Sequence, residues 1–307
     1  MSHAVTISIL TYKRHDHLMR ALKSALQYAD QVAEIIVVDN AAEPALKQRL
    51  ETDYPAVRYI AAPSNGGCEG RNIGLRAAGT PIVITIDDDV ELSSPNCIAE
   101  VEAAFSRDPQ LACLNFTVRG PDGQVLKRDW CHPRPISHAT REFETHFILE
   151  GACALNRSRV LEVGAYPSGF FLGHEGVDLG YRLIGSGYRI MHTPRVSGTH
   201  YAAEEERPDW RVYYYYTRNG IWVVYRYFPP LMAASRMCAH LATMAFFSLR
   251  AMQLPAYLRG CADAIRQLPA VERRNLDHDA LEHVRAIRAE RVPLFGRIQR
   301  HLRERIL

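Results

Sequence analysis

Hydrophobic residues in the first half of the chain follow two different spacings. Short continuous apolar runs, typical of buried strands, occupy residues 4–10, 34–38, 57–61 and 82–86. Between them, apolar residues recur at helical spacing over 18–26 and 71–78, and Ser94 followed by Pro95 predicts the start of a helix that runs to Phe105. Strands that alternate with helices predict an α/β fold with a mostly parallel, doubly wound sheet.

A further pair of strands is predicted directly after this region. Residues 111–118 and 124–130 are rich in apolar residues, and the turn-forming sequence Gly120-Pro121-Asp122-Gly123 joins them. This pattern is typical of a hairpin, which we expect to extend the sheet.

The pattern changes after about residue 205. Residues 213–228 are rich in aromatic side chains and arginine, and the apolar stretch 231–254 is interrupted by Arg236, His240 and Arg250. Those interruptions disfavour a free-standing membrane span and favour helices that pack on the first domain. Beyond Asp277, the spacing of Leu281, Val284 and Ile287 predicts an amphipathic helix. We therefore predict two parts, residues 1–205 and a helical region over 206–307.

Charge is divided unevenly between these two parts. The net charge is +3, yet the chain from Arg207 onward carries 17 arginines, no lysine and 8 acidic residues, a net charge of +9 that leaves −6 for the rest. A basic surface with exposed aromatic residues suits the interface of an anionic membrane, while an ordinary packing surface or a contact in a homo-oligomer is the alternative. The long apolar stretch makes nucleic acid the poorer partner.

Composition indicates a folded protein of a reducing compartment. At 307 residues with 47% hydrophobic residues, the chain is long enough to bury a full core. The seven cysteines are scattered and form no Cys-x-x-Cys pair, which disfavours a disulfide framework or a zinc site. The first residues show no signal-peptide pattern, so we expect a cytoplasmic protein that also contacts the inner face of the membrane if the basic region binds lipid.

The main candidate for chemistry is the acidic triplet Asp87-Asp88-Asp89, which closes the predicted strand at 82–86. Ligands of open α/β sheets bind at the carboxyl ends of the strands. Mg²⁺ and Mn²⁺ take oxygen ligands and share them with substrate phosphates. The triplet therefore predicts a site for a divalent metal, with a solvated loop that caps the next helix as the alternative.

A glycine-rich segment, residues 65–74, precedes this strand. Its glycines would let the backbone approach a ligand and leave free N–H groups for phosphate at a helix start. Its spacing and position do not match the Rossmann fingerprint, and the chain has no Walker-type phosphate loop. A nicotinamide cofactor and an ordinary nucleotide triphosphatase are both disfavoured.

These motifs together resemble family 2 glycosyltransferases with the GT-A fold. The resemblance extends over about residues 4–200 and rests on the order of the motifs more than on any one of them. They are Ile9-Leu10-Thr11-Tyr12-Lys13-Arg14, Val37-Val38-Asp39-Asn40, Asn65-Gly66-Gly67, Arg71-Asn72-Ile73-Gly74, Ile86-Asp87-Asp88-Asp89, Glu150 to Leu155, Gly164 to Pro167 with Phe170-Phe171, Glu175 to Arg182 and Gly187-Tyr188-Arg189.

The resemblance assigns roles to individual positions. It implies that a nucleoside diphosphate sugar is bound by Thr11, Tyr12, Arg14, Asp39, Asn65, Gly67, Arg71 and Asp88. Asp87 and Asp89 match the outer carboxylates of the family's Asp-x-Asp motif, Asp88 stands at its variable middle position, and His200 matches a histidine that completes the metal shell. The implied metal is Mg²⁺ or Mn²⁺.

The catalytic base is less clear, because the family's Glu-Asp-x-Asp-Leu motif is incomplete here. Gly176 replaces the second acid, to which the proton transfer is usually credited, while Glu175 and Asp178 remain. Glu175 is the preferred base, because Asp178 is four residues from Arg182 and is able to pair with it on a helix. The alternative is that both acids only favour a helix N-terminus.

The resemblance implies a metal-dependent, inverting glycosyltransferase. The expected donor is a UDP or dTDP sugar, and the expected acceptor is the hydroxyl of a glycan, a lipid-linked sugar or a small molecule in surface polysaccharide or related synthesis. Two alternatives stay open. One is a sugar nucleotidyltransferase, disfavoured because no glycine-rich loop follows the first strand, and the other is a nucleotide-sugar-binding scaffold without transfer activity, which Gly176 leaves possible.

Overall fold

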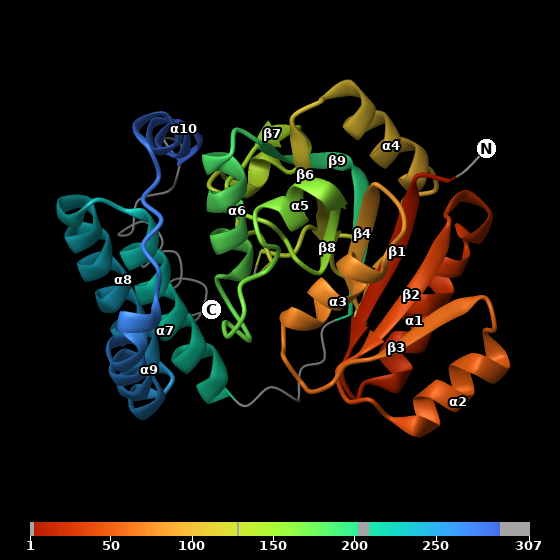
Figure 1. Ribbon diagram of the computed structural model, residues 1–307, viewed down its shortest axis with the longest axis horizontal. Helices are drawn as coiled ribbons and strands as arrows, with labels where there is room; N and C mark the ends of the chain where they lie inside the picture. The colour runs from red at the N-terminus through yellow and green to blue at the C-terminus, as the bar shows by residue number, and fades with distance from the viewer. Residues whose placement is uncertain (1–2, 128, 202–208, 289–307) are drawn as a thin grey trace.

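The computed structural model describes residues 3–127, 129–201 and 209–288. It shows one mixed β-sheet flanked by helices, beside which a group of C-terminal helices packs (Figure 1). The strands are β1 Val5–Thr11, β2 Glu34–Asp39, β3 Val57–Ala61, β4 Ile82–Asp87, β5 Val90–Leu92, β6 Leu111–Arg119, β7 Phe143–Glu144, β8 Ala152–Asn156 and β9 Arg189–His200. The α-helices are α1 His15–Leu26, α2 Pro44–Asp53, α3 Glu69–Ala77, α4 Cys97–Arg107, α5 Arg157–Glu162, α6 Glu175–Gly185, α7 Asp209–Tyr227, α8 Pro230–Arg250, α9 Leu254–Gln267 and α10 His278–Arg288. Short 3₁₀ turns lie at Ala29–Gln31, Ile136–His138 and Leu268–Ala270.

The sheet has the order β3-β2-β1-β4-β8-β6-β9-β5, and β7 also pairs with β9. The first four strands in space are parallel, as the alternation of strands and helices predicts. Beyond them β8 runs antiparallel to both β4 and β6. Thr11 is in register with Asp39, and Leu10 with Asp87. The carboxyl ends of β1, β2 and β4 therefore meet at one edge of the sheet, which is where the predicted site residues gather.

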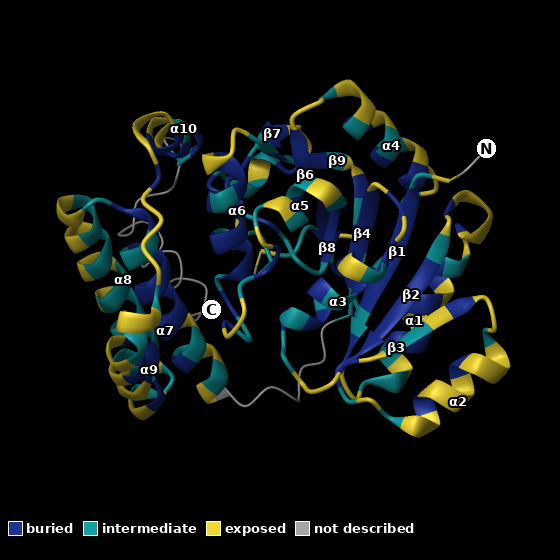
Figure 2. Ribbon diagram, viewed as in Figure 1, coloured by how far each residue is buried: buried dark blue, intermediate teal, exposed yellow. Residues whose placement is uncertain are grey.

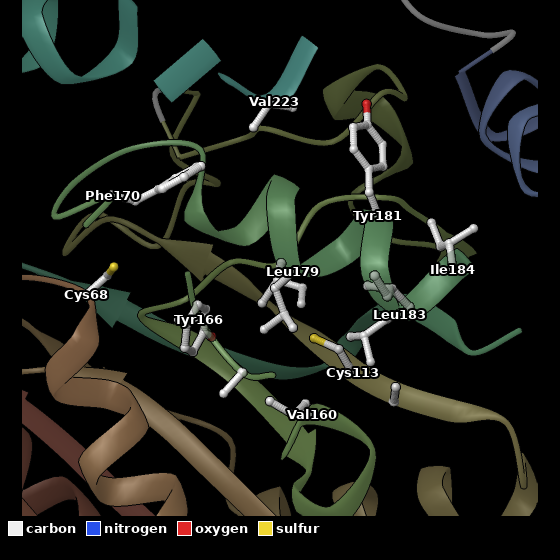
Figure 3. Packing of buried hydrophobic residues seen from close by; sticks show 14 of the residues in the cluster. Cys68, Cys113, Val160, Tyr166, Phe170, Leu179, Tyr181, Leu183, Ile184 and Val223 are labelled. Atoms are coloured by element: carbon white, nitrogen blue, oxygen red, sulfur yellow. The ribbon is translucent and has the colours of Figure 1, made fainter. Parts of the chain in front are cut away.

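Buried side chains form one core on each face of the sheet, and the central strands β1, β2 and β4 are buried along most of their length, whereas β3 at the edge is partly exposed (Figure 2). Helix α6 is held by one of these cores (Figure 3), where Leu179 and Leu183 point toward Cys113 and Val160 while Tyr181 points the other way. Because its inner face is packed in this manner, α6 presents its first residues at a fixed position beside the sheet edge.

Three local predictions differ from the structure. The turn of the predicted hairpin forms, with an Arg119–Val125 bridge, but the described part of residues 124–130 contains no strand. A longer second strand would have to pair with β6 at Asn115, but β8 already pairs with β6 at that residue. Helix α4 begins at Cys97 rather than next to Ser94. The sequence pattern does not predict α2, because only Leu46 and Leu50 of this helix are buried.

The C-terminal helices are tied to the first domain through α7. The amide of Asn219 donates hydrogen bonds of 2.9, 2.9 and 2.8 Å to the carbonyl oxygens of Phe170, Leu172 and Gly173, in the loop before α6. Helix α10 forms where predicted, with Val284 fully buried. The predicted boundary at 205/206 lies outside the described residues. Within the described chain, no helix combines the length and apolar character that crossing a bilayer requires.

Candidate functional site

A cavity of about 1250 Å³ lies between the carboxyl edge of the sheet and helices α7 and α8. It collects most of the residues that the sequence singles out. Those that line it are Thr11, Tyr12, Arg14, Asn65, Gly67, Arg71, Asp87, Asp88 and Glu175. Asp39, Asp89, Asp178 and His200 are not among the lining residues.

Asp88 connects the ends of β1 and β4. Its carboxylate is fully buried, accepts a 2.7 Å hydrogen bond from the hydroxyl of Thr11, and forms an ion pair with Arg14. Burial raises the pKa of Asp88 to about 7, although Arg14 and Thr11 act in the opposite direction. Asp88, which was expected at the variable middle position of the triplet, thus fixes Arg14 at the cavity wall.

Asp89 and His200 converge next to this cluster. His200 Nε2 lies 3.5 Å from Asp89 Oδ1, and His200 Nδ1 lies 2.7 Å from Asp129 Oδ2. A carboxylate that holds one ring nitrogen while the other faces a second acid is the usual outer-shell arrangement of a metal-binding histidine. Arg14 also pairs with Asp89 at 2.6 Å. Burial opposes protonation of His200, but Asp129 and Asp89 raise its pKa to about 9, so a metal ion would displace a proton there.

The donor set fits a metal that is shared with a ligand. Among the described residues, no group of three His, Cys, Asp or Glu side chains is placed to hold an ion by itself. Asp89 and His200 would supply two ligands, and Mg²⁺ is commonly bound by one or two carboxylates together with substrate phosphates. The residues present therefore suit a divalent ion that binds together with a diphosphate.

Asp87 faces a different partner. Its Oδ1 lies 2.5 Å from Nη2 of Arg71, whose side chain is only 10% exposed. Burial disfavours the charged guanidinium, yet Asp87 and, more weakly, Glu150 and Glu175 raise the pKa of Arg71 above its usual value. Arg71 thus keeps its positive charge among three carboxylates at the floor of the cavity.

Glu175 and Glu150 form a buried acidic pair beside Arg71. Glu175 is 5% exposed, and its Oε2 has no hydrogen-bond partner among the described residues. Burial raises the pKa of Glu175, against the effect of Arg71, and burial together with Glu175 raises the pKa of Glu150 to about 8. Both carboxylates line the cavity. Their environment favours the neutral form, as in sites where a carboxyl group exchanges protons near neutral pH.

Gly176, which replaces the second acid of the family motif, has no room for a side chain. A Cβ atom on Gly176 would lie 2.2 Å from the carbonyl oxygen of Ile148 and 2.3 Å from Oε1 of Glu150. That same oxygen accepts a 2.6 Å hydrogen bond from the Gly176 N–H. Glu150 therefore places a carboxylate against the position from which the usual acid would extend.

The glycine-rich segment is less open than expected. Gly67 has φ +60°, and a Cβ atom there would lie 2.1 Å from the carbonyl oxygen of Phe171, so glycine is needed for close packing. Its N–H donates to Oδ1 of Asn65 at 3.1 Å, and the next N–H, of Cys68, donates to Phe171. The predicted free N–H groups are thus engaged, although Asn65 and Gly67 do line the cavity.

Asp39 lies at the end of β2 but is turned away from the cavity. Its two oxygens accept 2.8 Å hydrogen bonds from the N–H groups of Ala41 and Glu43, and Tyr59 donates to it at 3.0 Å. In this arrangement Asp39 holds the loop that leads into α2.

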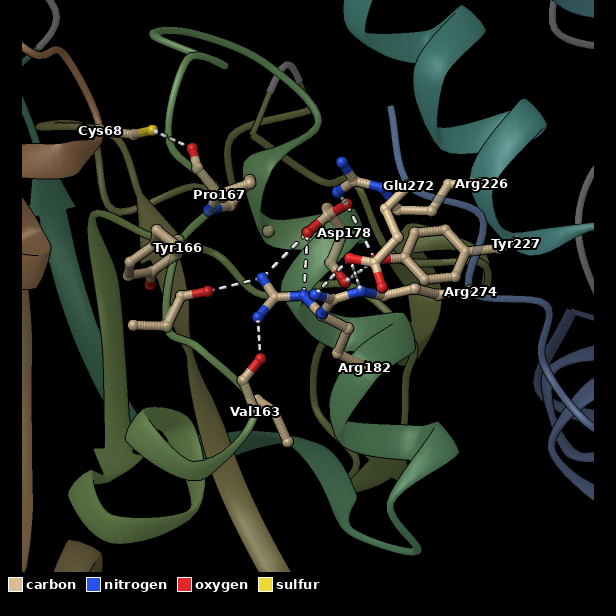
Figure 4. Close-up of polar contacts among 12 residues, drawn as sticks. Cys68, Val163, Tyr166, Pro167, Asp178, Arg182, Arg226, Tyr227, Glu272 and Arg274 are labelled. Carbon is tan, nitrogen blue, oxygen red and sulfur yellow. Dashed lines mark hydrogen bonds and ion pairs between the residues drawn. The ribbon is translucent and has the colours of Figure 1, made fainter. Parts of the chain in front are cut away.

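Asp178 belongs to a buried ionic network between α6 and α7 (Figure 4). Its oxygens contact Arg182 at 2.9 Å and Arg226 at 2.6 Å, and Tyr227 donates to it at 2.9 Å. The predicted pairing with Arg182 is present, and Arg226 and Tyr227 come from α7. Asp178 therefore joins the C-terminal helices to α6 and has no free oxygen facing the cavity.

We expect Asp178→Asn to reduce stability more than chemistry. Removing the charge leaves two largely buried guanidinium groups without their anion, which typically costs about 3–5 kcal/mol. Urea unfolding should show a midpoint well below that of the unchanged protein, whereas Glu175→Gln, which breaks no ion pair, should not lower it. Equal midpoints for Asp178→Asn and the unchanged protein would contradict this role.

The sequence patterns did not single out the other wall of the cavity. It is made by the loop 130–136 and by one face of α7 and α8, including Trp130, His132, Tyr216 and Arg236. These residues are far apart in the sequence, and nothing in their spacing marks them as neighbours. Glu150 appeared only within a family motif, and its contact with Gly176, which is 26 residues later in the chain, had no signal in the sequence.

The fold and the site define a class of protein. Parallel strands whose carboxyl ends carry an Asp-Asp-Asp turn, followed by an antiparallel strand and a helix that begins with a cavity-facing acid, make up the core of a GT-A glycosyltransferase. The family model described as Glycosyl transferase family 2 matches residues 6–164, and the chain belongs to this family. It is a glycosyltransferase, which excludes the scaffold and nucleotidyltransferase alternatives.

Similar proteins include a rhamnosyltransferase and a succinoglycan biosynthesis protein. The chain is 27% identical over 245 residues to the N-acetylglucosaminyl-diphospho-decaprenol L-rhamnosyltransferase of Mycobacterium tuberculosis, covering 68% of this chain and 80% of that protein. It is 32% identical over 127 residues to the succinoglycan biosynthesis protein ExoO of Rhizobium meliloti, covering 40% of this chain and 36% of that protein.

Solved structures confirm the GT-A fold. TarS 1–349 of S. aureus in complex with UDP-GlcNAc aligns with a TM-score of 0.59 at 15% identity, over 94% of this chain and 88% of that one. The mannosyltransferase PcManGT of Pyrobaculum calidifontis, in complex with GDP-Man and Mn²⁺, aligns with a TM-score of 0.56 at 16% identity, over 94% and 85%. At such identities the likeness establishes the fold alone.

Proposed function

We propose that this glycosyltransferase uses a divalent metal and transfers a sugar with inversion from a nucleoside diphosphate donor to an acceptor hydroxyl. The observation that carries this proposal is Glu175, a buried carboxylate. One of its oxygens has no partner among the residues that the structure describes, and it lies at the wall of a cavity that Arg14 and Arg71 also line. Direct displacement of a diphosphate requires a base for the acceptor hydroxyl and positive charge beside the leaving diphosphate, and this cavity has both.

In the proposed reaction, Glu175 accepts the proton of the acceptor hydroxyl while that oxygen attacks the anomeric carbon. The bond from that carbon to the diphosphate oxygen breaks, and the nucleoside diphosphate leaves from the opposite face. Arg71, held by Asp87, places positive charge at the floor of the cavity, and Arg14, held by Asp88 and Asp89, does the same at its wall. Both guanidinium groups are fixed before the donor arrives, so little reorganisation is needed.

Asp89 and His200 would hold the metal, which when bound supplies positive charge against the leaving diphosphate. Mg²⁺ and Mn²⁺ both suit this donor set. Thr11, Tyr12 and Arg14 at the end of β1, with Asn65 and Gly67, would bind the nucleoside. Asp39 would act there only through the loop that it holds, and Asp87 through Arg71.

The setting we propose is the cytoplasmic face of a membrane. The Mycobacterium tuberculosis relative has a decaprenol-linked substrate in its name. In this chain, Leu231, Leu249 and Met252 of the α8 region are 91%, 59% and 87% exposed, close to basic residues such as Arg250. Apolar side chains among arginines favour contact with anionic lipid. A UDP or dTDP sugar is our preferred donor.

Donor hydrolysis tests the proposed function. The purified protein with Mn²⁺ is incubated with a panel of UDP, dTDP and GDP sugars, and the release of nucleoside diphosphate is measured. We expect slow release from one donor, and loss of release when EDTA removes the metal. No release from any donor, or release that EDTA does not change, would contradict a metal-dependent transferase.

The acidic pair predicts a pH dependence. Because burial raises the pKa of Glu175 and Glu150, the base should be neutral at mildly acidic pH, and kcat/KM should rise with pH through a value above the usual 4.5 of glutamate. In Glu150→Gln we expect the rise to keep its position, because burial and the ionised Glu175 raise the pKa of Glu150 to about 8, so that Glu150 is still neutral while Glu175 loses its proton. A rise that moves to lower pH in this variant would show that Glu150 ionises before Glu175.

A further inference from the structure

Two arginines form a second cationic cluster in the cavity, away from the nucleotide side. Arg236 of α8 and Arg288 of α10 both line the cavity. Arg288 Nη1 lies 3.2 Å from the hydroxyl of Tyr181 and 3.2 Å from Nε2 of His146. Arg236 lies over the ring of Phe228, with 4.2 Å between the guanidinium carbon and the ring centroid.

Neither arginine has an anionic partner in the described part of the chain. Burial, followed by the nearby charge of Arg288, lowers the pKa of Arg236. The neighbouring Arg285 is paired with Glu282, and His283 with Glu144. Two partly buried like charges without a counter-ion destabilise a fold, so such a pair at a cavity wall indicates an anion that arrives with a ligand.

The positions of these residues on their helices indicate how far the two arginines lie from Glu175. Tyr181, which Arg288 contacts, is six residues after Glu175 on α6, a rise of about 9 Å along the helix. On the opposite wall, Arg236 lies one turn before His240, whose ring is 5.7 Å from that of His174, the residue before Glu175. These positions along the two helices place the arginines roughly 9 Å from the base along the cavity wall, a separation on the order of the length of one sugar phosphate.

We propose that Arg236 and Arg288 bind the phosphate or diphosphate of the acceptor, whose reacting hydroxyl is carried by the sugar directly attached to that phosphate. This rests on the proposed function, because Glu175 defines where the hydroxyl must lie. Arginine suits the role, since its planar donors match phosphate oxygens. The rings of Tyr181 and Phe228 pack against each other beneath the cluster, where Arg288 contacts the hydroxyl of Tyr181 and Arg236 lies over Phe228.

The test is calorimetric binding of two probes without divalent metal, so that the donor diphosphate site contributes little. The probes are glucose 1-phosphate and a glucose diphosphate ester of a short prenyl alcohol. We expect Arg236→Gln/Arg288→Gln to weaken binding by at least about tenfold. Arg285→Gln, on the same helix as Arg288 but outside the cavity lining and paired with Glu282, should bind within about twofold of the unchanged protein.

Stability provides a second measurement. Because the double substitution removes two like charges, its thermal unfolding midpoint should be equal to or above that of the unchanged protein, which separates lost binding from lost folding. Tighter binding of the prenyl ester assigns the phosphate to a lipid-linked acceptor, and equal binding assigns it to a soluble sugar phosphate; both support the site. Absence of binding by both probes, or binding that the double substitution leaves intact, overturns it.

This outcome is distinguishable from failure of the proposed function. Donor hydrolysis by the unchanged protein tests the transferase reaction without any acceptor. If the donor is hydrolysed but neither probe depends on Arg236 and Arg288, the transferase stands and the phosphate site is wrong. If no donor is hydrolysed, the proposed reaction is wrong whatever the probes show.

Discussion

Glu175→Gln is expected to lower kcat by about 10²-fold or more while leaving the affinity for the donor close to that of the unchanged enzyme. Glutamine has nearly the same shape, so the cavity and Arg71 keep their positions, but the amide cannot accept the proton of the acceptor hydroxyl. Single-turnover transfer measures the chemical step, and calorimetry with the donor measures binding.

Glu150→Gln is the matched control for this experiment. It removes a neighbouring carboxylate of the same length that already accepts a hydrogen bond from Gly176. A moderate cost in kcat with little change in the pH profile is expected for it, because Glu150 is still neutral while Glu175 loses its proton. If Glu150→Gln abolishes transfer and Glu175→Gln does not, the proton goes to Glu150, and the roles of the two acids are exchanged.

Asp89→Ala is expected to abolish metal-dependent binding of the donor. The substitution removes one of the two protein ligands proposed for the metal, and it also releases Arg14, which pairs with Asp89 at 2.6 Å. Donor affinity measured with and without Mn²⁺ should differ strongly for the unchanged protein and hardly at all for this variant.

Two further variants sharpen the assignment of the metal site. Asp122→Ala changes an exposed acid in a turn far from the cavity and should retain the effect of Mn²⁺. Asp87→Ala should weaken donor binding by freeing Arg71 while some of the Mn²⁺ effect persists. Retention of full Mn²⁺ dependence in Asp89→Ala would remove this residue from the metal site.

The strands of the first half could be predicted because each forms a nearly continuous apolar run that ends in polar residues. Residues 82–86 are all buried, and Asp87 follows at the edge where ligands bind. The order of the motifs then indicated the family and the fold, and both predictions are confirmed. The roles assigned to individual site residues stay predictions.

Long-range pairing explains what the sequence could not show. The second strand of the predicted hairpin does not form, because β8, which begins at Ala152, pairs with the edge of β6 that this strand needed. The acidic partner of Glu175 is twenty-five residues earlier in the chain, and the basic wall of the cavity comes from α8 and α10. Periodicity reports the burial of one segment, whereas these contacts depend on which segments meet.

Asn219 joins α7 to the loop before α6 through three hydrogen bonds, and Asp178 joins α6 back to α7. The two halves of the chain are therefore poor candidates for independent exchange between relatives. A chimera that receives a foreign C-terminal half would lose the partners of Phe170 and Asp178 together, so the loop and α6 should be transplanted with it. We therefore expect relatives that use different acceptors to differ together in α7 and in the loop before α6, and not in one of them alone.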